Sequence, residues 1–199
     1  MEPATLFRTR RLLLRCWHDT DAPLLKLAVD SSLAHLRPWM PWALSEPSDL
    51  GVIAARLAGF RERFGAGRDW NFGLFDPSQR EVLGGAGIHR RSAPDALEIG
   101  YWVRAAAAGQ GLGTEAAEAL TMIGFSHLGA TRMEIRCDPQ NHRSVGVPRR
   151  LGYRHLQTLV ADMVSPTGEP RDTMVWSLSL QEHRARRAAR ARDETREPG

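Results

Sequence analysis

Lysine is almost absent from this chain of 199 residues: Lys26 is the only lysine among 27 basic side chains. Walker A phosphate loops and pyridoxal-phosphate sites both require a lysine, and Lys26 follows no glycine-rich loop. The sequence also lacks an H-E-x-x-H motif, and Ser126 lacks the second glycine of a nucleophile elbow. These absences argue against P-loop proteins, pyridoxal-phosphate enzymes, zinc peptidases and serine hydrolases.

Cysteine and long apolar runs are scarce as well. Cys16 and Cys137 are far apart and form no C-x-x-C pair, so we expect two reduced thiols, no disulfide framework and no metal site. No apolar run approaches the roughly 18 residues that span a membrane, and Leu12–Leu14 is too short for the core of a signal peptide. We therefore expect a cytoplasmic protein without a membrane partner.

The composition that is present is typical of a globular protein, with 42% hydrophobic and 25% charged residues. A chain of this length fits one domain, which we expect over residues 1–181. The net charge of +4 is unevenly distributed, because five arginines and no carboxylate lie within residues 184–192. We expect residues 182–199 to form an arginine-rich tail, helical or disordered, that allows weak contact with a polyanion such as ribosomal RNA.

Hydrophobic periodicity predicts a mixed α/β fold. We expect a short helix after Pro23, a second that begins at Ser48 and ends at Gly65, a third that ends at Gly129 and a fourth over residues 141–151. Strands are expected over residues 11–17, 70–75, 81–89, 97–103, 132–137, 153–162 and 172–180. Short turns between the second, third and fourth of these strands indicate an antiparallel meander, and residues 35–42 are predicted to form a loop.

A glycine-rich loop with the sequence GQGLGT occupies residues 109–114, between a predicted strand and a predicted helix. Glycine allows successive backbone N–H groups to converge on an anion, and a helix N-terminus adds positive potential. The loop therefore predicts a ligand that carries phosphate. Its spacing differs from the G-x-G-x-x-G of dinucleotide enzymes, and a glycine-rich turn without a ligand stays open as the alternative.

The run LEIGYWV at residues 97–103, followed by GQGLGTEA at 109–116, resembles the acetyl-coenzyme A motif of the GNAT acyltransferase superfamily. The resemblance implies a GNAT-like α/β fold, with a central, mostly antiparallel twisted sheet of about seven strands flanked by about four helices. The superfamily often has arginine or glutamine where this chain has Ala108, which removes one side-chain contact to the pyrophosphate.

Later segments extend the resemblance in order over residues 9–180. Asn141 and Ser144 resemble the N-x-x-S motif of the superfamily, and LGY at 151–153 resembles its L-G-F segment. HLRPW at residues 35–39 resembles the opening segment of the RimJ/RimL-like branch, whose known members include N-terminal acetyltransferases for ribosomal proteins.

The resemblance implies an N-acetyltransferase that moves an acetyl group from acetyl-coenzyme A directly to a primary amine, without a metal. The expected acceptor is a protein or peptide N-terminus, such as that of a ribosomal protein. A small-molecule amine such as an antibiotic, an amino acid or a polyamine is the alternative acceptor, and a non-catalytic acyl-coenzyme A-binding module is the alternative function. Exposed strand edges leave a homodimer open.

Two residues are predicted to be catalytic. Glu98 is expected to accept the proton of the amine, through a water, with a solvated or ion-paired carboxylate as the alternative. Its strand face also carries Gly100, which is expected to open this face toward the substrate. Ser144 is expected to protonate or hydrogen-bond the leaving sulfur, with helix capping as the alternative and Tyr153 as the fallback proton donor.

The remaining predictions concern binding. Trp39 and Trp42, together with Glu98, are expected to form the acceptor pocket, with core packing as the alternative for the two tryptophans. The resemblance implies that coenzyme contacts come from the strand end, the loop and the later motif: Trp102, Val103, Gly109, Gln110, Gly111, Leu112, Gly113, Thr114 and Asn141.

Overall fold

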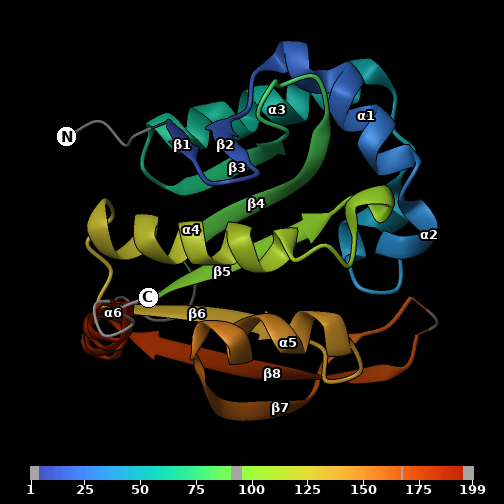
Figure 1. The fold of residues 1–199 in the computed structure, drawn as a ribbon. Coiled ribbons are helices and arrows are strands. Elements are labelled where there is room, and N and C mark those ends of the chain that lie inside the picture. The colour runs from blue at the N-terminus through green and yellow to red at the C-terminus, as the bar shows by residue number, and fades with distance from the viewer. Residues whose placement is uncertain (1–4, 91–95, 167, 195–199) are drawn as a thin grey trace.

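The computed structural model describes residues 5–90, 96–166 and 168–194, and its strands form one sheet. The strands are β1 (Leu6–Arg8), β2 (Leu13–Cys16), β3 (Asp69–Phe75), β4 (Val82–Arg90), β5 (Ala96–Val103), β6 (Arg132–Cys137), β7 (Arg154–Val164) and β8 (Pro170–Ser179). Their order across the sheet is β1-β2-β3-β4-β5-β6-β8-β7 (Figure 1). Neighbouring strands are antiparallel except β5 and β6, which are parallel.

Six α-helices lie among the described residues: α1 (Ala22–Asp30), α2 (Leu33–Leu36), α3 (Leu50–Gly65), α4 (Leu112–Ser126), α5 (His142–Leu151) and α6 (Leu180–Glu194). Helix α4 forms the crossover that two parallel strands require, and it passes in front of β4 and β5 in Figure 1. In the described part of the chain, no helix combines the length and the apolar character that crossing a membrane requires.

Two hydrophobic clusters form because neighbouring residues of a strand point to opposite faces of the sheet. On β2, Leu14 belongs to the larger cluster, which packs α4 against the middle strands through residues such as Leu120. Leu13 belongs to the second cluster, which packs α1 and α3 against the other face through residues such as Leu25 and Ile53. The sheet is therefore covered on both faces, and α4 is held directly above β5.

The predicted mixed α/β fold with a mostly antiparallel sheet is confirmed, including the meander of β3, β4 and β5. The predicted counts were low by one strand and two helices: β1 and α2 have only three and four residues, and α6 (Leu180–Glu194) lies in the tail, which was predicted as helical or disordered and not counted. Periodicity over so few residues gives no signal. The prediction of a loop over residues 35–42 was wrong in part, since α2 ends at Leu36 and a 3₁₀ turn spans Pro41–Ser45.

The arginine-rich tail is helical as far as it is described, because α6 continues to Glu194. Residues 195–199 lie outside the described residues. The division into a domain and a tail, and the contact of the tail with a polyanion, stay predictions.

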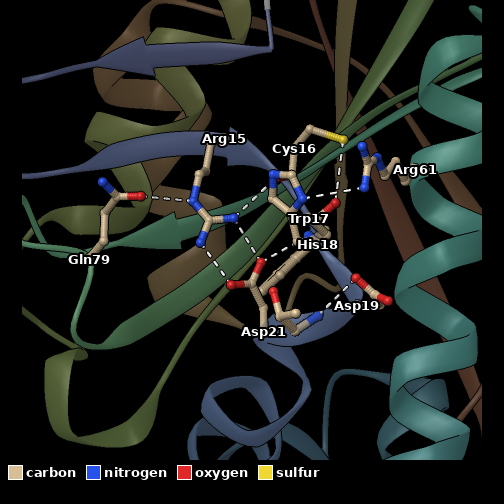
Figure 2. A network of polar contacts seen from close by, with 9 residues as sticks. Arg15, Cys16, Trp17, His18, Asp19, Asp21, Arg61 and Gln79 are labelled. Atoms are coloured by element: carbon tan, nitrogen blue, oxygen red, sulfur yellow. Dashed lines mark hydrogen bonds and ion pairs between the residues drawn. The ribbon is translucent and has the colours of Figure 1, made fainter.

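A buried ion pair fixes the start of α1 to the sheet (Figure 2). Both oxygens of Asp21 accept hydrogen bonds from the Arg15 guanidinium, at 2.7 and 2.8 Å, and the backbone N–H of His18 donates to the same carboxylate at 2.9 Å. The guanidinium also lies 3.9 Å above the ring of Phe75. Burial raises the pKa of Asp21, but the bonds from Arg15 and His18 outweigh this effect and hold the pKa below its ordinary value of 3.8.

We expect Asp21→Asn to lower the free energy of unfolding by about 2–3 kcal/mol at pH 7, because Arg15 loses its carboxylate in a shielded position. A lowered folded-state pKa contributes stability above the unfolded-state pKa, and this contribution is lost as the pH falls through the folded-state value. The difference between the two proteins should therefore shrink from pH 7 to pH 3 in urea titrations. Glu62→Gln, which removes an exposed pair with Arg68, is the control and should change stability by less than about 0.5 kcal/mol.

Candidate active site

The site begins where β5 and β6 separate. These two strands are paired from Ala96 with Arg132 to Ile99 with Ile135, and no further. Beyond that point β5 stays paired with β4 as far as Val103, and β6 stays paired with β8 as far as Cys137. Each strand therefore turns an unpaired backbone edge toward the other, and N–H and C=O groups on these edges are available to a ligand.

A cavity of about 740 Å³ opens at this separation, and we call it the groove. Its walls are the end of β5, the glycine-rich loop, helix α5 with the turn before it, and residues of the segment 35–40. Of the predicted coenzyme-binding residues, it is lined by Trp102, Val103, Gly109, Gly111, Leu112, Gly113, Thr114 and Asn141. Gln110 is the exception, because its side chain turns back to donate to the carbonyl of Ala106 at 3.4 Å.

The glycine-rich loop presents its amides to the groove. Gly109 and Gly111 have φ angles of +79° and +81°, a left-handed backbone that glycine adopts without strain. Within the described part of the chain, the backbone amides of residues 109–113 donate no hydrogen bond. Arg11 fixes the loop from outside, donating to the Gln110 carbonyl at 2.7 Å and to the Glu115 carboxylate at 2.6 Å. Free amides at the N-terminus of α4 form a cradle for an anion.

Sequence reasoning missed a cation beside this cradle. Arg150, in the last turn of α5, donates to the Thr114 hydroxyl at 3.2 and 3.3 Å and has no carboxylate partner among the described residues. Ala108 lines the same groove, but its methyl side chain has no charge with which to bind an anion. Arg143 lies two turns before Arg150 on α5 and also lines the groove. The i, i+7 spacing of Arg143 and Arg150 shows in the sequence that they share one face of a helix. Only the structure shows that this helix, α5, lies beside the glycine-rich loop.

A second missed residue is Tyr101, whose side chain crosses from β5 to α5. Its hydroxyl lies 3.3 Å from the Ser144 hydroxyl, and both residues line the groove. Burial raises the pKa of Tyr101 well above its usual range, so the phenol keeps its proton at neutral pH. Its alternation with Ile99 and Val103 indicated only a core-facing position. The two hydroxyls together form a proton-donating pair at the wall of the groove.

The N-x-x-S segment also has its capping role. The Asn141 side chain accepts a hydrogen bond from the backbone N–H of Ser144 at 3.1 Å, which makes Asn141 the N-cap of α5. This cap uses the backbone of Ser144 and leaves its hydroxyl to Tyr101 and the Cys137 thiol. Nearby, burial raises the pKa of the Cys137 thiol to about 11, although a hydrogen bond with Ser144 lowers it in part. Cys137 is thus a protonated thiol at neutral pH and a poor nucleophile.

A second cavity of about 400 Å³, which we call the pocket, contains Glu98. The Glu98 side chain is 12% exposed, and the Nε of Arg136 lies 3.2 Å from one of its oxygens. The expectation that Gly100 opens this strand face to the substrate stays a prediction, and Gly100 lines neither cavity. The imidazole of His89 lies 3.6 Å from the position a Cβ of Gly100 would take, so a histidine borders that space. The His89 ring is in turn held by Asp69 at 2.7 Å.

The predicted tryptophans and Tyr153 occupy different places. Trp39 lines both the groove and the pocket. Trp42 lines neither and packs edge to face on Trp102, with ring centroids 5.8 Å apart. The fallback donor Tyr153 lies in the core, bonded to the Thr121 hydroxyl at 2.7 Å, and also lines neither cavity.

The indole of Trp102 accounts for a glycine on the next strand. Any Cβ at Gly85 would lie 2.5 Å from the Trp102 Nε1, so only glycine fits there. The ring of Trp102 lies beside Gly85 and Trp42, and the residue also lines the groove.

Comparison with known proteins gives a consistent result. A family model described as an acetyltransferase (GNAT) domain matches residues 11–154. Among curated proteins, the chain is similar to [ribosomal protein uS5]-alanine N-acetyltransferase of Escherichia coli (strain K12). The two are 28% identical over 179 residues, which is 89% of this chain and 92% of the relative.

Solved structures show the same fold. RimJ of Mycobacterium smegmatis, in complex with CoA-disulfide, is 25% identical with a TM-score of 0.74, and the match covers 90% of this chain and 89% of that one. RimL, a ribosomal L7/L12 α-N-protein acetyltransferase in complex with coenzyme A, is 20% identical with a TM-score of 0.80, over 89% of this chain and 99% of that one.

Proposed function

The chain belongs to the GNAT acetyltransferase family, in its RimJ/RimL-like branch, and we propose that it acetylates the N-terminal amine of a protein or peptide with acetyl-coenzyme A. The observation that carries this proposal is that two cavities meet at Trp39. The groove has an anion cradle and a pair of hydroxyls, and the pocket has a carboxylate. A thioester donor and an amine acceptor need these features on opposite sides of one reaction centre.

The groove fits coenzyme A in its donor groups. The free amides of residues 109–113 and the Arg150 guanidinium suit the pyrophosphate. The unpaired edge of β5 between Gly100 and Val103 suits the amides of the pantetheine arm, with Asn141 on the facing wall. When bound, the coenzyme supplies the acetyl group as a thioester.

The residues of the chain divide the proton transfers between them. Glu98 accepts the proton that the amine must lose to attack, directly or through a water. Ser144, paired with Tyr101, donates a proton to the leaving sulfur. A backbone N–H near Val103 polarises the thioester carbonyl. Because the Cys137 thiol stays protonated, direct transfer to the amine is favoured over an acyl-cysteine intermediate.

Arg150→Met is expected to raise the Kd for coenzyme A about 10–30-fold, because a charge-assisted hydrogen bond to phosphate is lost. The affinity for pantetheine, which has no phosphate, should be unchanged. Both affinities are measured by isothermal titration calorimetry. Arg149→Met is a matched control in the same turn of α5, since Arg149 stacks over Trp176 and lines neither cavity. Equal affinities of the Arg150→Met variant and the wild type would contradict the phosphate contact.

The acceptor class is supported by the lining of the pocket. The carboxylates of Glu98, Asp138 and Asp162 can accept hydrogen bonds from an amine, and Trp39 and Val164 supply apolar walls. Three arginines line the same pocket and balance the charge of these carboxylates, so the pocket suits an amine through hydrogen bonds rather than through net charge. The similar protein of Escherichia coli is named for an alanine of a ribosomal protein. A small side chain next to the reacting amine is therefore the first acceptor to test.

The test of function uses three peptides of one sequence that contains an internal lysine. One has a free N-terminal alanine, one a free N-terminal serine, and one an acetylated N-terminus. We expect mass spectrometry to show one acetyl group on each free N-terminus and none on the blocked peptide. Acetylation of the lysine alone, or of antibiotics and polyamines alone, would contradict the N-terminal acceptor. No transfer to any amine, together with coenzyme A binding, would favour a binding module.

A further inference from the structure

Arg171 on β8 connects three parts of the site that are distant in the sequence. Its Nη1 donates to the carbonyl of Pro38 at 3.0 Å and to the carboxylate of Asp138 at 2.9 Å. The guanidinium carbon also lies 5.2 Å from the ring centroid of Trp39. The ion pair is shielded, with side chains 23% and 17% exposed. Arg171 therefore holds the backbone before Trp39 and the face of its ring at the same time.

The segment that carries Trp39 has little else to fix it to the sheet. The backbone amides of Trp39 and Met40 both donate to Leu36, at 2.9 and 2.8 Å. Within the described part of the chain, the hydrogen bonds of residues 38–40 other than the one from Arg171 join them only to Leu36 and Ala43. The position of Trp39 relative to β6 and β8 thus depends on that arginine.

Asp138 extends the connection to the start of α5. One of its oxygens binds Arg171, and the other accepts the backbone N–H of Gln140 at 2.7 Å. Gln140 precedes Asn141, the N-cap that orients the backbone of Ser144. The same ion pair therefore ties Trp39 to the turn that presents the groove hydroxyl.

We propose that Arg171 is a positioning residue that holds Trp39 as the partition between groove and pocket, and that Trp39 so held forms the wall against which the first residue of the acceptor binds. The inference rests on the proposed function, since it assigns the pocket to the acceptor. Trp39 contributes to both cavities, whereas Arg171 and Asp138 line only the pocket. Loss of Arg171 should therefore weaken binding of the acceptor more than binding of the coenzyme.

The experiment compares Arg171→Met and Arg171→Lys with the wild type. For Arg171→Met we expect the KM for the peptide to rise about tenfold, as for the loss of one charge-assisted hydrogen bond. The coenzyme A Kd should stay within twofold of the wild-type value, and hydrogen exchange at residues 37–41 should accelerate. Arg171→Lys keeps a donor for Asp138 and Pro38, so its KM for the peptide should lie close to the wild-type value.

Two further variants separate positioning from general damage. Arg90→Met removes an arginine that stacks over Trp70 at the same 5.2 Å and lines neither cavity, so it should leave all these values unchanged. Trp39→Leu keeps the Arg171–Asp138 pair and should reproduce the rise in peptide KM. Should Arg171→Met fail to fold, Arg171→Lys and Trp39→Leu still decide the outcome.

Three results would overturn the inference: a peptide KM within twofold of wild type in Arg171→Met, an equal weakening of peptide and coenzyme, or unchanged exchange at residues 37–41. Failure of the proposed function is a separate outcome, because it appears as the absence of peptide acetylation by the wild-type protein. In that case the hydrogen-exchange rates at residues 37–41 still show whether Arg171 holds this segment in place.

Discussion

Ser144→Ala is expected to lower kcat about 10³-fold and to leave the affinity for coenzyme A unchanged. A hydroxyl that gives its proton to the leaving sulfur acts only in the transition state, and such proton transfers contribute on the order of 10²–10⁴-fold. The structure makes this substitution a clean one. Asn141 caps α5 through the backbone N–H of Ser144, which alanine retains, so the helix should not be weakened.

Steady-state kinetics measures kcat, and calorimetry measures the affinity for coenzyme A. A second substitution, at Tyr101, tests whether the two hydroxyls act together. Tyr101→Phe removes the hydroxyl 3.3 Å from Ser144 and should lower kcat by a smaller factor, about tenfold. If the two hydroxyls form one relay, the double variant should be no slower than Ser144→Ala. A kcat within threefold of wild type in Ser144→Ala would remove this serine from the mechanism.

Glu98→Gln is expected to lower kcat/KM for the peptide about 10³-fold at pH 7, with unchanged coenzyme affinity. The amine must be neutral to attack, and an α-amino group has a pKa of about 8, so most of it is protonated at pH 7. Glutamine has the shape of glutamate but accepts no proton. Between pH 7 and pH 9 the neutral fraction of the amine rises about tenfold. The loss of kcat/KM in Glu98→Gln, relative to the wild type, should therefore shrink by about the same factor.

A control is needed because Glu98→Gln also removes a carboxylate from Arg136. Glu134 lies across from Glu98 on β6, with one oxygen 3.6 Å from the same guanidinium, but it lines neither cavity. Glu134→Gln should therefore leave kcat/KM within about threefold of wild type. Equal losses in the two variants would assign Glu98 to the ion-pair network, and a deficit that does not change with pH would exclude it as the base.

Features that depend on neighbouring residues could be predicted from the sequence. The 3.6-residue apolar repeat of α3 predicted a helix from Ser48 to Gly65, and the structure has Leu50–Gly65. The glycines of the loop predicted a turn with converging amides, and Gly109 and Gly111 adopt the left-handed backbone there. Helix capping, which was the alternative role for the N-x-x-S segment, is performed by Asn141. The order of the motifs led to the family, which the matched domain over residues 11–154 confirms. Such signals survive in a sequence because each element forms from contacts within a few residues.

The tertiary structure alone decided which side chains meet. Tyr101 and Ser144 are 43 residues apart in the chain, Arg150 and Thr114 are 36 apart, and Arg171 and Pro38 are 133 apart. These contacts depend on where β5 and β6 separate and on how α5 crosses the sheet, and no local repeat records either feature. For the same reason the sequence placed Trp39 and Trp42 together, whereas packing on Trp102 turned one of them away from both cavities.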